Sequence, residues 1–219
     1  MTEPKTTAIA AGLWSSIVFD SLIKVGGKAD VQGGQIGVLP FVGLNPLLSQ
    51  LVLRTLRLNC LTADYAPLWE ELYDPSWRLD TWTDPSSPRP PLGDVGPAWS
   101  MATPLRTDYD RRMALVEIDA LAALMLGLTA EQLCAMYRTQ FSVLRKYEYS
   151  MFFDAAGRKY AKHHQTAGVR QQKGDYESIL AWLDDPSTPL RVGITAPFTK
   201  PDRELEMTRA FNHFASLVP

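Results

Sequence analysis

The chain has 219 residues, with 22 Lys and Arg against 24 Asp and Glu, a formal net charge of −2 and 46% hydrophobic residues. This balance excludes a strongly basic protein that coats nucleic acid and a disordered acidic tail. The two cysteines, Cys60 and Cys134, are far apart in the sequence. Their spacing excludes a disulfide scaffold and most structural zinc sites, and it favours the reducing cytoplasm.

The first third of the chain predicts two helical parts around a glycine-rich stretch. Apolar spacing predicts one helix over 7–24, ended by Gly26 and Gly27, and a short strand over 35–40. Asn45 and Pro46 predict the start of the next helix. That helix is expected to bury Leu48, Leu51, Val52 and Leu58 and to expose Gln50, Arg54 and Arg57. The uncharged stretches 6–19 and 31–53 are interpreted as buried segments; the second is too polar and too broken by Gly and Pro to cross a membrane.

The middle of the chain is rich in proline and tryptophan. Residues 75–104 hold seven of the 16 prolines, with Trp77, Trp82 and Trp99 among them. This composition predicts an irregular crossover that packs on a surface, after a short helix over 65–73.

The last part predicts a helical scaffold. We expect helices over 109–127, 130–140, 176–183 and 203–217. A capping box that begins at Thr129 starts the second of these, and Asp202 caps the last. On the first of them, Arg111, Arg112, Glu117 and Asp119 are expected to lie largely off the apolar face. The whole chain therefore predicts a helix-dominated α+β fold, with short strands and glycine-rich loops packed on helices. The predicted segments are 1–74, 75–104 and 105–219.

Familiar catalytic and metal-binding patterns are absent from the sequence. It contains no GxSxG, P-loop or GxGxxG motif, and the adjacent His163 and His164 are expected to point apart. The carboxylates are interpreted as solvated surface charge and helix caps. We therefore predict no catalytic residue and no metal ligand.

Two segments have the composition of a DNA-contacting loop. Residues 157–173 carry five Lys and Arg, no Asp or Glu, and three glutamines. Lys and Arg bind phosphates, while Gln and Arg also read base edges. The glycine-rich stretch adds two lysines and two glutamines. A solvated loop and an ordinary glycine-rich hairpin remain the alternatives for the two segments.

A series of motifs over 12–217 resembles one family. The first group is a Phe–Asp helix end, a Gly–Gly turn and a Gln-led apolar strand: Val18-Phe19-Asp20, Lys24-Val25-Gly26-Gly27 and Gln35-Ile36-Gly37-Val38-Leu39-Pro40. The second is Arg111-Arg112, Glu117-Ile118-Asp119-Ala120, Gly127-Leu128-Thr129 and Phe141-Ser142-Val143-Leu144. The last is Pro197-Phe198, Pro201-Asp202-Arg203-Glu204 and Phe214. Together they resemble the C-terminal target-recognition region of type IIG restriction–modification enzymes and related phage-defence N6-adenine DNA methyltransferases.

The resemblance implies a bacterial, cytoplasmic DNA-binding portion of a DNA methyltransferase that recognises the target in double-stranded DNA. The DNA-contacting residues that we expect are Lys24, Lys28, Gln32, Gln35, Arg158, Lys159, Lys162, Arg170, Gln171 and Lys173. Enzymes of this family hold the flipped adenine with an Asn/Asp-Pro-Pro-Tyr/Phe motif. The strings closest to it here are Asn45-Pro46-Leu47-Leu48 and Arg89-Pro90-Pro91-Leu92, and neither matches it. We therefore expect no methyl transfer by this chain alone and no cofactor in it, since S-adenosylmethionine would be bound by the catalytic domain.

Two other readings stay open. The chain is alternatively an interaction subunit that docks on a separate methyltransferase through the tryptophans between Trp69 and Trp99. It is alternatively an enzyme of another type, for which converging carboxylates or a pocket around His213 would be the sign.

Overall fold

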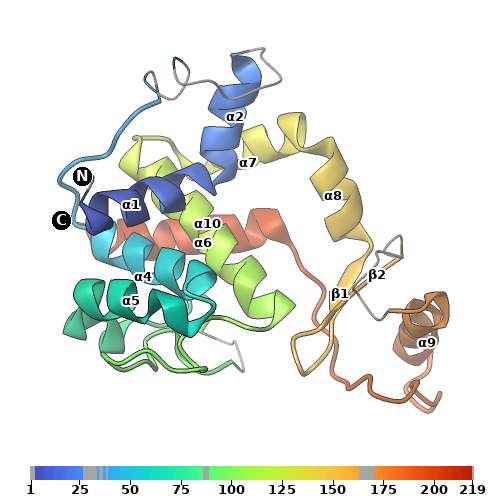
Figure 1. Cartoon of the computed structure of the whole chain (residues 1–219). Coiled ribbons are helices and arrows are strands. Elements are labelled where there is room, and N and C mark those ends of the chain that lie inside the picture. The colour runs from blue at the N-terminus through green and yellow to red at the C-terminus, as the bar shows by residue number, and fades with distance from the viewer. Residues whose placement is uncertain are drawn as a thin grey trace.

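The computed structural model describes residues 3–26, 34, 37, 39–85, 89–162 and 171–218. The helices are α1 (Pro4–Trp14), α2 (Ile17–Val25), α4 (Leu48–Asn59), α5 (Ala66–Leu72), α6 (Asp108–Met125), α7 (Ala130–Gln140), α8 (Ser142–Tyr149), α9 (Lys173–Asp184) and α10 (Arg203–Ala215). Two 3-10 turns, Ala63–Tyr65 and Pro75–Leu79, flank α5. The strands β1 (Met151–Phe153) and β2 (Lys159–Ala161) pair antiparallel, with Phe152 opposite Tyr160. The helix-dominated α+β prediction is confirmed (Figure 1).

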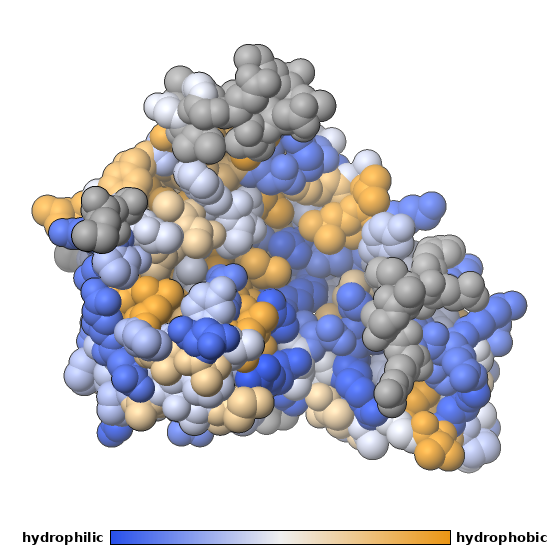
Figure 2. All heavy atoms as spheres, in the orientation of Figure 1, coloured by the Kyte–Doolittle hydropathy of each residue, from blue (hydrophilic) through white to orange (hydrophobic). Residues whose placement is uncertain are grey.

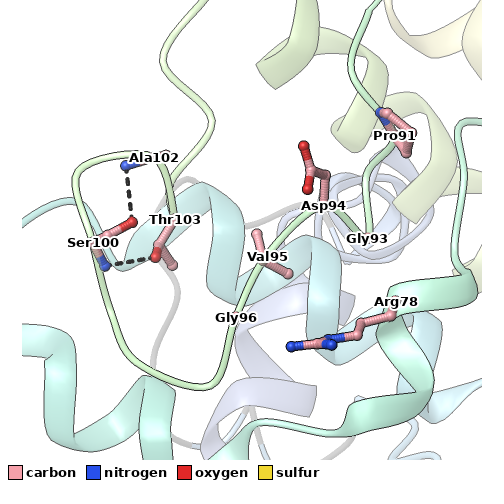
Figure 3. A pocket seen from close by; sticks show the side chains of 9 residues that line it. All are labelled: Arg78, Pro91, Gly93, Asp94, Val95, Gly96, Ser100, Ala102 and Thr103. Carbon is pink, nitrogen blue, oxygen red and sulfur yellow. Dashed lines mark hydrogen bonds between the residues drawn. The ribbon is translucent and has the colours of Figure 1, made fainter.

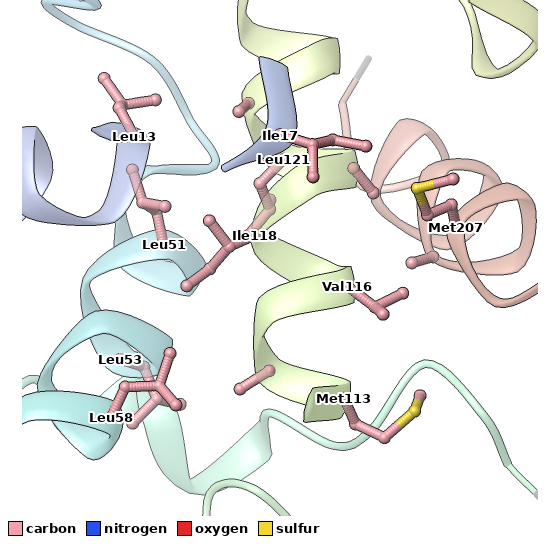
Figure 4. Packing of buried hydrophobic residues seen from close by; sticks show 14 of the residues in the cluster. Leu13, Ile17, Leu51, Leu53, Leu58, Met113, Val116, Ile118, Leu121 and Met207 are labelled. Carbon is pink, nitrogen blue, oxygen red and sulfur yellow. The ribbon is translucent and has the colours of Figure 1, made fainter. Parts of the chain in front are cut away.

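Helix α6 is the centre of the main hydrophobic core. Thr107 caps its start by accepting a hydrogen bond from the Asp110 amide. Figure 4 shows Ile118 of α6 directed toward Leu51 of α4. Val116, also of α6, and Met207 of α10 lie on the other side of α6. These four side chains are fully buried. Burial of each such side chain contributes about 1.5–3 kcal/mol, so α6 joins the N-terminal and C-terminal helices into one body.

The predicted first helix is in fact two helices that meet at a bend of 72°. The Ser16 hydroxyl accepts a hydrogen bond from the Phe19 amide and so starts α2. The Ile17 amide, which a continuous helix would satisfy internally, donates instead to Asp119 Oδ1 at 2.8 Å. Within the described residues no single helix is long and apolar enough to cross a membrane, although this bent pair meets both criteria when its two parts are taken together.

Helix α4 differs from the prediction at its start and on its polar side. Asn45 Oδ1 accepts from the Leu47 amide at 2.9 Å, which closes a turn, and the helix begins only at Leu48. Arg54 and Arg57, expected on the exposed face, are 0% and 8% exposed. Arg57 is buried because it donates to the carbonyls of Leu92 and Thr103 in the irregular segment, which needs donors for its backbone. The expected strand over 35–40 lies largely outside the described residues.

The segment rich in proline and tryptophan packs on α4 and α5. Trp77 and Trp82 are 2% and 7% exposed, and Trp99 is partly buried. Each indole nitrogen donates to a backbone carbonyl, of Ser49, Pro90 and Cys60 respectively. The packing expected from three tryptophans is therefore present, and their apolar faces are used inside the molecule.

The C-terminal helices begin at their expected caps. Thr129 and Gln132 form the predicted capping box of α7, and Asp202 accepts from the Leu205 amide at the start of α10. Helix α9 begins three residues earlier than predicted because Gln172 and Asp175 cap each other. The hairpin and α9 lie to one side of the helical body, where a second, small cluster joins Tyr160, Tyr176, Ile179 and Ile194 (Figure 1).

Candidate nucleic-acid interface

A cleft of about 1010 Å³ separates the helical body from the hairpin. Its walls are the α1–α2 bend, the first turns of α6, the α7–α8 joint and the β1–β2 hairpin. Figure 2 shows the hollow, with hydrophilic side chains toward its floor. Lys24 and Lys159, which the sequence analysis assigned to two separate DNA-contacting segments, both line this cleft together with Arg111.

Five cations line the cleft: Lys24, Arg111, Lys159, Arg112 and Arg203. The first three have different surroundings. Lys24 Nζ lies 2.9 Å from Asp20 Oδ2 and 3.7 Å from the centre of the Phe141 ring. This pair is about half exposed, so it contributes little to stability. Arg111 donates to the carbonyls of Leu58 and Leu105. Within the described residues, neither Arg111 nor the Lys159 side chain has a carboxylate partner. Asp20, Asp108 and Glu148 line the same cleft, so its five cations exceed its carboxylates by two. An anionic ligand would meet this surplus of positive charge.

The floor of the cleft is a buried ion network centred on Glu148. This carboxylate, 5% exposed, accepts from Arg112 Nε at 2.9 Å, from Arg203 Nη1 at 2.8 Å and from the Tyr137 hydroxyl at 2.6 Å. Burial alone would raise the pKa of Glu148, but the Arg203 and Arg112 guanidinium groups lower it overall. Burial and Glu148 raise the pKa of Tyr137. Glu148 is therefore a charged hub that holds α6, α7, α8 and α10 together.

The network extends from this hub to both ends of the helical body. Arg203 Nη2 donates to Asp119 Oδ2 at 2.7 Å, and Arg112 Nη1 donates to Glu206 Oε2 at 2.6 Å. Asp119 also holds the Ile17 amide, so the α1–α2 bend that lines the cleft is fixed by the same groups. Arg112 and Asp119, expected to lie largely off the apolar face, are buried, and the interpretation of Asp119 as a solvated surface charge was wrong. They are 8% and 1% exposed, because their partners come from α8 and α10.

A second buried ion network lies on the opposite side of α6. Glu117, 0% exposed, accepts from Arg54 Nε at 2.7 Å and from the Thr83 amide at 2.7 Å. Arg54 also forms a bidentate ion pair with Asp80, in which Nη1 and Nη2 donate to Oδ2 and Oδ1 at 2.8 and 3.0 Å. The prediction that these carboxylates are solvated surface charges was therefore wrong for Glu117 too. The arginine that pairs with Glu117 lies 63 positions earlier in the sequence.

The other predicted DNA-contacting residues lie around the hairpin and α9. Arg158 pairs with the buried Asp154 at 2.6 Å and also donates to the Gly193 carbonyl. The Gln171 amide exchanges two hydrogen bonds with the Ala161 backbone. Lys162 is exposed, and Lys173, whose side chain is 77% exposed, lies 3.5 Å from Glu177. Lys28, Gln32, Gln35 and Arg170 lie outside the described residues, as do His163 and His164.

Helix α8 was not among the DNA-contacting segments predicted from the sequence. Its outer side carries Arg145, Lys146 and Tyr149, all exposed, and Lys200 Nζ donates to the Tyr149 carbonyl beside it. Burial lowers the pKa of Lys200. A signal was available, because the stretch 142–149 holds two cations and two tyrosines with Glu148 as its sole acid.

Groups that would carry out catalysis do not converge in the described part of the chain. The pocket that His213 lines also holds Asp84 and Arg89, but Asp84 pairs with Arg209 and Arg89 with Asp110, each at 2.7 Å. Within the described residues there is no group of three metal-ligating side chains. Burial raises the pKa of the Cys60 thiol to about 11 and also raises that of Cys134, so both are poor nucleophiles.

A further pocket, of about 650 Å³, lies on the irregular segment, and Figure 3 shows the side chains that line it, among them Arg78, Asp94 and Thr103. Its polar side chains serve the loop itself, since the Thr103 hydroxyl accepts from the Ser100 amide at 2.8 Å. Arg78 donates to the Tyr73 hydroxyl at 3.2 Å. No nucleophile lies beside a base among the residues that line it.

Comparison of the chain with family models, with curated proteins and with solved structures gave no match. The assignment of a function therefore depends on the geometry of the cleft and on the motifs of the sequence.

Proposed function

We propose that this chain is the DNA-binding, target-recognition portion of an adenine-specific DNA methyltransferase in a bacterial restriction–modification or phage-defence system, and that it acts in the cytoplasm. The methyl group would come from S-adenosylmethionine held by a catalytic domain for which this sequence has no motif. The chain supplies affinity and selectivity for double-stranded DNA.

One observation carries this proposal. Lys24 and Lys159 are 135 positions apart in the sequence, yet both line the same cleft. Arg111 lines it too. Two of these cations have no carboxylate partner within the described residues. Duplex DNA carries a dense row of phosphates, and its release of counterions on contact with lysine and arginine supplies most of non-specific affinity. A cleft with cations on several walls fits such a partner.

Binding to a fluorescein-labelled duplex of about thirty base pairs, followed by anisotropy at salt concentrations from about 50 to 200 mM, tests the proposal. The wild-type chain should bind with an affinity that falls steeply with salt. The double substitution Lys24→Gln/Lys159→Gln should reduce the slope of log affinity against log salt by about 2, since each phosphate contact contributes about 0.9.

Lys5→Gln is the matched control, because Lys5 is an exposed lysine of α1 that does not line the cleft. Its slope should equal that of the wild type. A folded wild-type chain that does not bind duplex DNA, or that binds it without salt dependence, overturns the proposal. Equal slopes for the double variant and the wild type overturn the role of the cleft.

Docking on a separate methyltransferase subunit is the second candidate. The tryptophans expected to form its surface are engaged internally, since Trp69 and Trp77 are 0% and 2% exposed. The observation that favours it is a different one: Trp14 and Val143, on the rim of the cleft, are 46% and 67% exposed. Pull-down of a methyltransferase encoded beside this gene, lost on Trp14→Ser, would support docking; no capture would exclude it.

A further inference from the structure

Helix α8 is anchored in an unusual way. Most surface helices are held by an apolar stripe. In α8 the buried residue is Glu148, held by Arg112, Arg203 and Tyr137, while Val143 is 67% and Tyr149 is 84% exposed. Leu144 adds a partly buried contact with the main core. Most of the helix surface is thus left for a partner.

The outer side of α8 is positively charged and aromatic. Arg145 and Tyr149 are four residues apart and so lie on one face, next to Lys146. Within the described residues, neither Arg145 nor Lys146 has a carboxylate partner. More cations surround the end of the helix, because the Lys162 amide bonds to the Ser150 carbonyl at 3.4 Å and Lys200 Nζ bonds to the Tyr149 carbonyl. Charge complementarity therefore calls for an anionic partner.

The guanidinium group of Arg145 is already oriented. Its Nη1 donates to the Arg138 carbonyl at 3.1 Å, and its central carbon lies 6.0 Å from the centre of the Tyr137 ring. Tyr137 is fixed in turn by its 2.6 Å hydrogen bond to Glu148. In the described part of the chain, Nε and Nη2 of Arg145 have no acceptor. Two donors therefore remain for a ligand on a side chain that one hydrogen bond ties to the end of α7.

We infer that α8 enters the major groove of DNA, where Arg145 donates to the O6 and N7 atoms of a guanine and Lys146 contacts an adjacent phosphate. The major groove admits an α-helix, and arginine with guanine is the commonest base-specific contact. Tyr149 lies against the sugar–phosphate edge. The inference rests on the proposed DNA-binding function and adds a second contacting surface to it, since Arg145, Lys146 and Tyr149 do not line the cleft.

Selection of duplexes from a randomised pool by the full chain, followed by sequencing and by affinity measurement, tests the inference. The wild-type chain should enrich duplexes with guanine at one fixed position, by about tenfold over the other bases. Arg145→Gln keeps most of the side-chain volume and should abolish that preference. Lys146→Gln should keep the preference but lower the salt slope by about 1, as expected for a phosphate contact.

The two proposals fail in different ways. If the chain binds duplexes with salt dependence but without a base preference, or if Arg145→Gln and Arg145→Ala both keep the guanine preference, the inference about α8 is overturned while DNA binding stands. If the chain binds no duplex, both are overturned. Far-UV circular dichroism of each variant establishes that it is folded, and Lys5→Gln, with unchanged preference and slope within the error, is required for the assignment to hold.

Discussion

Replacement of Arg54 by methionine removes the cation from the buried network on α4 and α6 and keeps a side chain of similar length. Arg54 is 0% exposed and donates to Glu117 at 2.7 Å, to Asp80 at 2.8 and 3.0 Å, and to the Gln50 carbonyl at 3.0 Å. Burial alone would lower the pKa of Arg54, but Asp80 and Glu117 raise it above its usual value. The arginine is therefore charged at every accessible pH.

The magnitude follows from the two carboxylates that the substitution leaves behind. Asp80, whose side chain is 10% exposed, can turn toward water, whereas the Glu117 side chain is 0% exposed and keeps one donor, the Thr83 amide. Removal of one partner of a buried ion pair costs about 3–5 kcal/mol. Since a domain is stable by about 5–15 kcal/mol, Arg54→Met should remove a large part of the free energy of unfolding.

Urea denaturation followed by tryptophan fluorescence measures the effect. Arg54→Met should lower the midpoint without a change of m-value, and it should lower Tm by about 2–4 °C per kcal/mol. Arg78→Met, at an exposed arginine, is the control and should change stability by at most about 0.5 kcal/mol.

The double variant Arg54→Met/Glu117→Gln separates charge from shape. It removes the stranded carboxylate and keeps an acceptor for the Thr83 amide, so it should be more stable than the sum of the two single variants predicts by about 0.5–3 kcal/mol. A loss below about 1 kcal/mol for Arg54→Met, or strict additivity in the double variant, would refute the reasoning.

Three further outcomes follow from described contacts. Glu148→Gln should cost about 3 kcal/mol at pH 7. Because the folded pKa of Glu148 lies below its usual value, its contribution is complete above about pH 4.3 and declines as the pH falls through the folded pKa, so the two unfolding curves should converge in acid; parallel curves would contradict this. Gly93→Ala should destabilise by about 1–3 kcal/mol, since a Cβ there would lie 2.0 Å from the Trp77 carbonyl oxygen, whereas Gly43→Ala, with nothing within 4 Å, should be silent in thermal melts. Cys60, with its pKa raised to about 11, should resist a thiol reagent at pH 8 until the protein is unfolded, and rapid modification of the native chain would show that the site is open.

The helices could be predicted where local signals decide them. Thr129 and Asp202 cap the starts of α7 and α10, because each side chain accepts a hydrogen bond from an amide only three residues later. The bend after Trp14 carries one local signal, the Ser16 cap of α2, which was not predicted, and one distant contact, because the acceptor for the Ile17 amide is Asp119, 102 positions later. Local propensity favours one continuous helix there, and a tertiary hydrogen bond overrides it.

The candidate site shows the same division. The basic composition of 157–173 predicted Lys159 as a DNA-contacting residue, and Lys159 lines the cleft. The floor was not predictable, since arginines and glutamates on a helix look like solvated charges until their partners are known. Arg112 bonds to Glu206, 94 positions away, and only the folded chain brings such groups together. The role of Glu148 was not predictable from the sequence for the same reason.

The long separations within the Glu148 network have a consequence for the order of folding. Each of its ion pairs and hydrogen bonds between elements closes a loop, and the longest loop is closed by the hydrogen bond from the Ile17 amide to Asp119 over 102 positions. Closure of long loops costs entropy before any contact repays it, so contacts of this kind form late and slow the reaction. We therefore expect the floor of the cleft to be completed late in folding, when α10 docks on α6. A kinetic intermediate that has its helices but lacks this docking would hold α8 by Leu144 alone, and the α8 surface that we propose for DNA would not yet be in place.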